Sequence, residues 1–331
     1  MDKLVVFGKL LALLVLITAI GCGNQTAPTH PTKSELNGQT FSGEYPVKIL
    51  CTTGLVAELA QRVGGEHVEV TALMSHQVDP HMYKPRVGDV GLLDKADVIF
   101  YSGLHLEGRM ADLFVTFARK KPTFAVSEGL VTRGDKRLRE PPEFEDAYDP
   151  HIWHDVSLWA DCAHDVADML SSVDPKNAEA YDKNAQVYME QLAKLHQYCQ
   201  EEVAKIPEAS RVMVTAHDAF GYFGQAYGVE VFGLKGISSA EEKDLAHQEE
   251  IQKMIIQRKI PAVFVESTIN DRTVEALIEP CRAAGWNLKN GGELYADALG
   301  AADSEAGTYT GMVRHNVDTI VGGLTATLND Q

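Results

Sequence analysis

Short apolar runs alternate with amphipathic helical stretches from about residue 47 to the end of the chain. Near-continuous apolar runs between helices are typical of strands that are buried on both faces of a parallel sheet. The pattern therefore predicts an α/β protein of two doubly wound lobes, each with a mostly parallel four-stranded sheet. The predicted strands are Val47–Thr53, Val68–Met74, Asp97–Gly103, Thr123–Glu128, Arg211–His217, Val229–Leu234, Ala262–Ser267 and Trp286–Leu294.

One long helix is predicted between the two halves, over residues 174–207. Asp174 is a plausible N-cap, Pro175 suits the first helical position, and no glycine or proline follows until Pro207. About 30 helical residues extend over about 45 Å, roughly the length of a whole domain. The sequence thus predicts an N-terminal lobe over 47–173 and a C-terminal lobe over 208–331, joined by one rigid backbone helix.

The N-terminal residues 1–22 have the character of an export signal. An apolar run over 10–20 is too short to span a bilayer, and small residues follow it. Cys22 stands where a bacterial lipobox has its lipid-modified cysteine, although Ala19 replaces the usual leucine. An ordinary cleaved signal or an uncleaved anchor are the alternatives. Residues 23–46, rich in Thr, Pro, Gly and Asn, are expected to form a flexible tether.

Composition narrows the class of protein further. The formal net charge of −17 argues against nucleic acid as a partner, because its phosphates would repel such a surface. The four cysteines after Cys22 match no zinc ribbon or CxxC motif, and their pairing is not set by their spacing. Buried free thiols are the simpler interpretation. These cysteines are Cys51, Cys162, Cys199 and Cys281.

Candidate ligand residues follow the predicted strands of both lobes. The tripeptide Asp-Pro-His occurs twice, ending at His81 and at His151, each time after a strand pattern. His217 ends a strand of the second half, and Asp297 follows the last one. In open parallel sheets, ligands bind beyond the carboxyl ends of the strands. Three imidazoles and one carboxylate make a complete tetrahedral set for zinc.

Spacing alone leaves alternatives open. His105 and Glu266 also lie at strand edges, and His154 lies three residues after the second Asp-Pro-His histidine. A single histidine in a loop is usually solvated or hydrogen-bonded. Asp79 and Asp149 precede prolines, a position at which aspartate stabilises turns.

Seven stretches of the chain resemble the metal-binding solute receptors of bacterial ABC transporters for zinc and manganese. The resemblance covers nearly all of residues 47–328 in order, and "AHDAFGYF" is its most specific part. It implies two α/β lobes on one backbone helix, a monomer, a permease and an ATPase as partners, and a location in the periplasm or on the outer face of the cytoplasmic membrane. The stretches are "DPHMYKP", "SGLHLEG", "DPHIWHD", "VTAHDAFGYFGQAYGVEVFGLKGIS", "FVESTIN", "GGELYADALG" and "GTYTGMVRHNVDTI".

Site residues also follow from the resemblance. It implies that the metal ligands are His81, His151, His217 and Asp297, with His154 outside the coordination sphere. His105 and Glu266 match positions near the family's site, and they are expected to orient the ligands. Cys22 would carry the lipid.

The choice of metal rests on the donor set. Three imidazoles and a carboxylate favour zinc over manganese, which prefers harder oxygen donors. Family members dedicated to manganese usually have glutamate where this chain has His217. Against zinc, residues 131–149 hold no histidine, whereas several zinc receptors have a histidine-rich loop there. Zn(II) is therefore predicted, with Mn(II) or Fe(II) as alternatives.

Two other classes of protein compete with a receptor. A secreted metal-dependent hydrolase would need an open metal position and a general base. The chain contains neither H-E-x-x-H nor G-x-S-x-G. An adhesin that uses its metal only for stability would unfold when the metal is removed. The sequence therefore predicts a receptor and not an enzyme.

Overall fold

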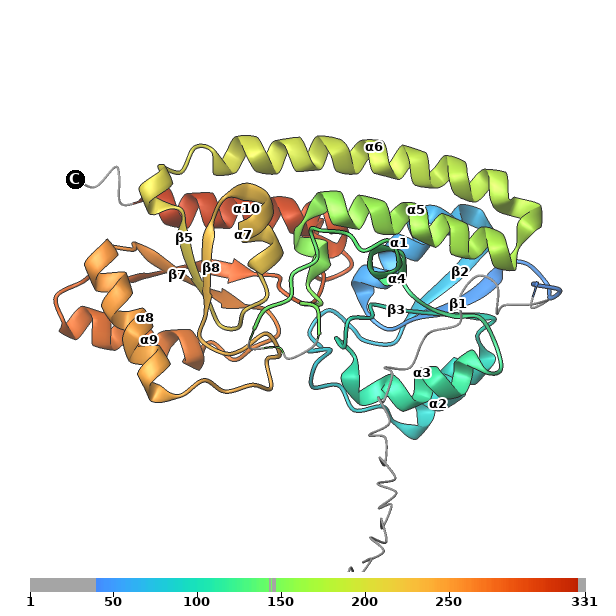
Figure 1. Cartoon of the computed structure of the whole chain (residues 1–331), viewed down its shortest axis with the longest axis horizontal. Coiled ribbons are helices and arrows are strands. Elements are labelled where there is room, and N and C mark those ends of the chain that lie inside the picture. The colour runs from blue at the N-terminus through green and yellow to red at the C-terminus, as the bar shows by residue number, and fades with distance from the viewer. Residues whose placement is uncertain (1–39, 143, 145–146, 327–331) are drawn as a thin grey trace, which may run out of the picture.

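The computed structural model describes residues 40–142, 144 and 147–326. Two α/β lobes lie side by side, and a long helix runs along both of them (Figure 1). This architecture confirms the predicted fold class. The predicted signal sequence, Cys22 and most of the predicted tether lie outside the described residues. Among the helices that the structure describes, none is both long and apolar enough to cross a membrane.

The N-terminal lobe contains a parallel sheet with strand order β2-β1-β3-β4. Each strand lies within a predicted apolar run, and β3 and β4 are buried along their whole length. Helices α1 and α5 lie on one side of the sheet, and α2 and α3 lie on the other (Figure 1). The strands are β1 (Val47–Cys51), β2 (Val68–Ala72), β3 (Val98–Tyr101) and β4 (Thr123–Ala125), and the helices are α1 (Gly54–Gly64), α2 (Val87–Lys95), α3 (Ala111–Ala118), α4 (Glu128–Thr132) and α5 (Val156–Val173).

The C-terminal lobe is built from two parallel strand pairs, β5 with β6 and β7 with β8. Strand β5 lies beside β7, but the described pairings include no ladder between them, so the lobe departs from one continuous four-stranded sheet. The β7–β8 register shifts between Val263 and Val265. The strands are β5 (Val212–Thr215), β6 (Glu230–Gly233), β7 (Ala262–Glu266) and β8 (Lys289–Leu294), and the helices are α7 (Gly221–Tyr227), α8 (Leu245–Arg258), α9 (Arg272–Ala283) and α10 (Tyr309–Thr325).

The linking helix α6 covers Ala178–Val203, 26 residues, after a 3-10 turn at Pro175–Asn177. Its buried residues recur every three or four positions, which gives one apolar stripe along the helix. That stripe packs on α1 and α5 of the N-terminal lobe and on α10 of the C-terminal lobe. Its buried residues are Tyr181, Ala185, Tyr188, Leu192, Leu195, Cys199 and Val203.

The sequence suggested Asp174 as the N-cap of this helix, but its side chain makes no capping hydrogen bond. Its carboxylate instead accepts hydrogen bonds from the Tyr45 hydroxyl at 2.7 Å, the Tyr181 hydroxyl at 2.7 Å and the Asn177 amide at 2.7 Å. Tyr45 belongs to the predicted tether. The described part of that segment is therefore attached to the N-terminal lobe, because its side chains find partners at the end of α5.

One hydrophobic core continues through both lobes. It includes Val47 of β1, Trp159 of α5, Leu192 of α6 and Ile320 of α10. Cys51, Cys162, Cys199 and Cys281 are all buried and free. A shared core limits relative movement, because parting the lobes widely would expose apolar surface.

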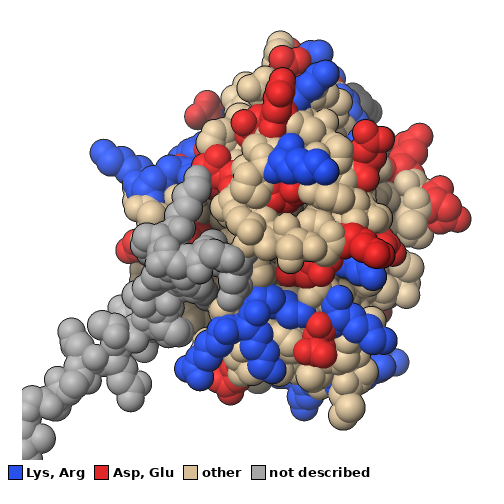
Figure 2. Space-filling view, turned by 90° about the vertical axis from the view of Figure 1, so that its right-hand side faces the viewer, with Lys and Arg blue, Asp and Glu red and all other residues tan. Residues whose placement is uncertain are grey.

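The charge of the chain is unevenly distributed over its surface. Figure 2 looks onto the end formed by the N-terminal lobe, where Lys and Arg gather in the lower part, on the side of α2 and α3. Acidic and basic side chains are interspersed in the upper part of the same view. The net charge of −17 therefore coexists with a basic region at this end.

The hydroxyl of Tyr181 is expected to contribute to stability through the buried Asp174 carboxylate. Tyr181→Phe removes one hydrogen bond to a charged acceptor, so the free energy of unfolding of the metal-free chain should fall by about 1.5 kcal/mol. Urea denaturation followed by circular dichroism measures this change. Tyr198→Phe is the matched control, because Tyr198 lies on the same helix and bonds Asp318 at an exposed position. An equal loss in both variants would contradict the prediction.

Candidate metal centre

Four predicted ligand residues come together between the lobes, at the carboxyl ends of their strands. His81 lies in the loop after β2, and His151 directly precedes a 3-10 turn at Ile152–His154. His217 follows β5, and Asp297 follows β8. His81 is 8% exposed, whereas Asp297 is 1% exposed and the other two histidines are fully buried. Each lobe therefore contributes two side chains to one buried cluster.

The donor atoms of these residues converge on a common point. The Nε2 atom of His151 lies 3.2 Å from Nε2 of His81 and 3.3 Å from Nε2 of His217. All four side chains offer ligand atoms within 4.8 Å of one another. A tetrahedral ion with bonds of about 2.0–2.1 Å places its ligand atoms about 3.3 Å apart. The cluster therefore has the dimensions of a tetrahedral metal site.

Within the described residues, the carboxylate of Asp297 lacks the hydrogen bonds that a buried carboxylate normally has. Both of its oxygens are buried and lack a hydrogen-bond partner among the described residues. They lie 3.3 Å from Nε2 of His151 and 3.4 Å from Nε2 of His217. Burial favours the neutral acid, but these rings outweigh it and hold the pKa of Asp297 well below its usual range. Neither oxygen has a hydrogen-bond donor among the described residues, and a cation bound between the carboxylate and the imidazoles would give both oxygens a direct partner.

His151 is oriented by the carboxylate of Asp149, which is itself buried. One oxygen of Asp149 accepts from the His151 backbone N–H at 3.0 Å and lies 2.8 Å from Nδ1 of its ring. The other oxygen accepts from the Arg139 guanidinium at 2.7 Å. Burial alone would lower the pKa of His151, but Asp149 and Asp297 outweigh burial and raise it to about 9. Because Asp149 accepts the proton on Nδ1, Nε2 is the ring nitrogen that faces the cluster, and a cation would bind there in exchange for the Nε2 proton.

His217 has the same kind of support from Glu266, at the end of β7. The Glu266 carboxylate accepts from the His217 backbone N–H at 2.9 Å and lies 2.5 Å from Nδ1 of its ring. Burial would lower the pKa of His217, but Glu266 and Asp297 raise it well above its usual value. Glu266 was expected to orient a ligand, and this contact with Nδ1 of His217 would allow it to do so.

His105 does not reach the cluster. Its side chain is exposed, and the described contacts include no hydrogen bond or ion pair from its ring to the site. The backbone turns sharply here, with φ values of 86° at Gly103, 52° at Leu104 and 65° at His105. This turn buries Glu107 instead, whose carboxylate accepts from the Thr52 hydroxyl at 2.6 Å and the Ser102 N–H at 2.8 Å. The expected orienting role of His105 therefore lacks a contact to act through.

Asp297 is positioned by a contact that the sequence did not reveal. The Trp153 indole donates to the carbonyl of Ala296 at 2.7 Å, and Nε2 of His154 lies 3.0 Å from the same oxygen. Burial lowers the pKa of His154 to about 3, and since a carbonyl oxygen only accepts, the neutral ring can bond to it only as the tautomer with a proton on Nε2. Two donors from the N-terminal lobe thus hold the residue before Asp297, and His154 stays outside the cluster. Only the fold brings residues about 140 positions apart together.

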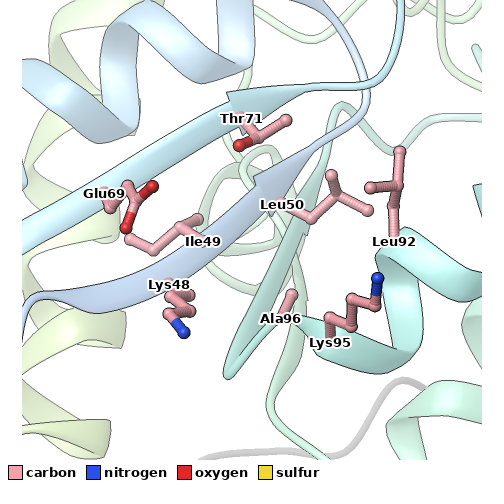
Figure 3. Close-up of a pocket in the computed structure, with 8 residues that line it drawn as sticks. All are labelled: Lys48, Ile49, Leu50, Glu69, Thr71, Leu92, Lys95 and Ala96. Atoms are coloured by element: carbon pink, nitrogen blue, oxygen red, sulfur yellow. The ribbon is translucent and has the colours of Figure 1, made fainter. Parts of the chain in front are cut away.

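A shallow pocket elsewhere on the N-terminal lobe is not part of this centre. It lies between β1, β2 and α2, with Lys48 and Lys95 among its lining side chains (Figure 3). None of the four clustered residues lines it. Two lysines at such a surface would repel a metal cation.

A family model described as "zinc-uptake complex component A, periplasmic" matches residues 49–323, most of the chain. The chain belongs to this ZnuA family. Membership agrees with the resemblance that the motifs indicated, to the metal-binding solute receptors of ABC transporters.

Several relatives match this ZnuA-family chain over most of their length. The manganese-binding lipoprotein MntA of Bacillus subtilis is 38% identical over 318 residues, which cover 96% of this chain and 99% of MntA. The zinc-binding protein TroA of Treponema pallidum is 41% identical over 276 residues, 83% of this chain and 88% of TroA. The solved structure of periplasmic TroA from the same organism superposes with a TM-score of 0.80 at 40% identity, over 85% of this chain and 99% of that one.

Removing the support of His217 is expected to weaken metal binding without unfolding the chain. Glu266→Gln leaves Nδ1 without its charged partner, so Zn(II) affinity should fall about 10–100-fold. Competition against a fluorescent zinc chelator measures the affinity. Glu279→Gln, an exposed glutamate of the same lobe, is the matched control and should bind like the parent chain. Equal affinities for Glu266→Gln and the parent chain would show that Glu266 does not support His217.

Proposed function

We propose that this ZnuA-family chain is the extracytoplasmic substrate-binding protein of a metal ABC importer, which captures Zn(II) between its lobes and delivers it to the membrane permease. The observation that carries the proposal is the buried Asp297 carboxylate, which has no hydrogen-bond donor among the described residues and faces the nitrogens of three imidazoles. His81 and His151 would bind the ion from the N-terminal lobe, and His217 and Asp297 from the C-terminal lobe. In this reading the metal is cargo.

The number of protein donors favours transport over catalysis. Four donor groups complete a tetrahedral sphere, whereas a catalytic zinc keeps one position open for water or substrate. The names of the relatives MntA and TroA describe binding proteins, which supports the same reading. We therefore propose a binding protein without enzymatic activity.

Zinc is proposed on the chemistry of the donors. Imidazole nitrogen suits zinc, whereas manganese prefers harder oxygen donors, and only Asp297 supplies oxygen here. Manganese is the second candidate, because MntA of Bacillus subtilis, named for manganese, matches 96% of this chain. A bidentate Asp297 would raise the coordination number and admit Mn(II) or Fe(II).

The expected place of the protein is the outer face of the cytoplasmic membrane or the periplasm. Relatives named as lipoproteins include MntA of Bacillus subtilis and PsaA of Streptococcus pneumoniae. We propose that Cys22 carries the lipid and that the monomeric body serves a permease and its ATPase.

Release would require the lobes to part slightly at the permease, which would pull one pair of ligands away from the other. The continuous core and α6 make a wide swing unfavourable. A displacement of about 1 Å would suffice, because metal–ligand bonds tolerate only about 0.2 Å. Measuring the Zn(II) release rate with and without reconstituted permease tests this step, and an unchanged rate would exclude it.

Competitive titration of the metal-free, full-length chain with Zn(II) and Mn(II) tests the proposed cargo. One Zn(II) per chain should bind tightly and displace Mn(II). His217→Ala should lose this binding and stay folded, since the apo fold rests on the shared core. His164→Ala, whose imidazole is exposed on α5 and does not belong to the cluster, is the control and should bind like the parent chain.

Three outcomes decide the proposal. Tight zinc binding that His217→Ala abolishes supports a zinc receptor. Mn(II) that competes evenly with Zn(II) would make manganese the cargo. Absence of binding for both metals would overturn the ligand assignment.

A further inference from the structure

The three histidines of the cluster are not held in the same way. His151 and His217 each have a buried carboxylate at Nδ1, from Asp149 and Glu266. No hydrogen bond to Nδ1 of His81 is among the described contacts, and His81 is the most exposed of the three. The position of His81 therefore depends on how its backbone is held.

That backbone is held by the side chain of Asp79. The Oδ1 atom of Asp79 accepts from the backbone N–H of His81 at 2.9 Å and of Met82 at 3.3 Å. The turn that these bonds close sets the direction of the His81 ring. Anything that fixes the Asp79 carboxylate also fixes the ligand.

The second oxygen of Asp79 reaches the other lobe. Oδ2 accepts from the hydroxyl of Ser239 at 2.6 Å, a short distance for a hydroxyl bonded to a carboxylate. Ser239 is 6% exposed and lies in the loop after β6. Among the described hydrogen bonds, and apart from contacts within the cluster itself, this bond links the loop of His81 to the C-terminal lobe.

The loop of Ser239 is in turn attached to the segment of His217. The N–H of Asp218, the residue after His217, donates to the carbonyl of Gly236 at 3.1 Å. Lys235 closes the same loop by donating to the Ser239 carbonyl at 3.3 Å and pairing with Glu242 at 2.5 Å. A continuous series of contacts thus runs from the His217 segment through Ser239 and Asp79 to His81.

We infer that Ser239 is a positioning residue for His81, whose hydroxyl holds the Asp79 turn across the cleft and so keeps the fourth donor on the ion while the lobes are closed. The inference rests on the proposed function, because it concerns the retention of captured metal. Parting the lobes separates Ser239 from Asp79, which frees the turn of His81 at the same moment. Ser239 thereby couples the separation of the lobes to loss of a ligand.

The rate of Zn(II) release from the full-length chain tests this inference, measured by stopped-flow transfer to a fluorescent chelator. Ser239→Ala should accelerate release about tenfold or more, because it removes a buried hydrogen bond to a charged group. The association rate should stay within about twofold. The urea midpoint of the metal-free chain should fall by no more than the loss of one hydrogen bond explains. A purely structural role would lower that midpoint and leave the release rate unchanged.

Two further variants make the test specific. Ser238→Ala is the matched control, since among the described contacts the neighbouring Ser238 hydroxyl accepts from Ala240 N–H within its own loop and reaches no residue of the N-terminal lobe. It should release zinc like the parent chain. In an Asp79→Ala background, Ser239→Ala should cause no additional acceleration, because its partner is already gone.

The possible results separate this inference from the proposed function. A parent chain that binds no metal would remove the proposed function itself. Tight binding by the parent chain, with the same release rate in Ser239→Ala, would overturn only the role of Ser239. Equal acceleration by Ser239→Ala with and without Asp79 would overturn it as well, since Ser239 would then act by another route.

Discussion

The arrangement around Asp297 is the constraint on which the rest of the site depends. A buried carboxylate without a hydrogen-bond donor is unfavourable, and three imidazole nitrogens that face one another are unfavourable too. A single cation would relieve both conflicts. The closed arrangement of the lobes is thus favourable when an ion is bound, which is the property that a capture protein requires.

Rigidity of the scaffold makes this constraint effective. Helix α6 packs on both lobes, and the same hydrophobic core passes from β1 to α10. The ligands therefore converge with little freedom to relax apart when the site is empty. Small displacements are then sufficient to change the coordination, and large hinge movements are unnecessary.

The ligands differ in which lobe orients them, and this difference bears on how the ion is released. Carboxylates orient His151 and His217 from within their own lobes, whereas the turn of His81 depends on a hydroxyl of the opposite lobe. Ala296, next to Asp297, is likewise held from the opposite lobe, by Trp153 and His154. The positions of His81 and Asp297 therefore depend directly on how closely the two lobes approach each other.

The sequence by itself determined the alternation of strands and helices, the long link and the residue types of the site. Apolar runs mark buried parallel strands, and polar residues directly after them mark the binding edge, as at His217 and Asp297. Glu266 also lies at such an edge, but its supporting role was implied by the family resemblance and not by the pattern. The tertiary structure alone decided which edge residues meet. It left His105 exposed, without a described contact to the cluster, gave Asp149 a second role behind His151, and paired Ser239 with Asp79, 160 positions away. Such contacts arise from the packing of one lobe against the other, and the periodicity of the sequence reports only local structure.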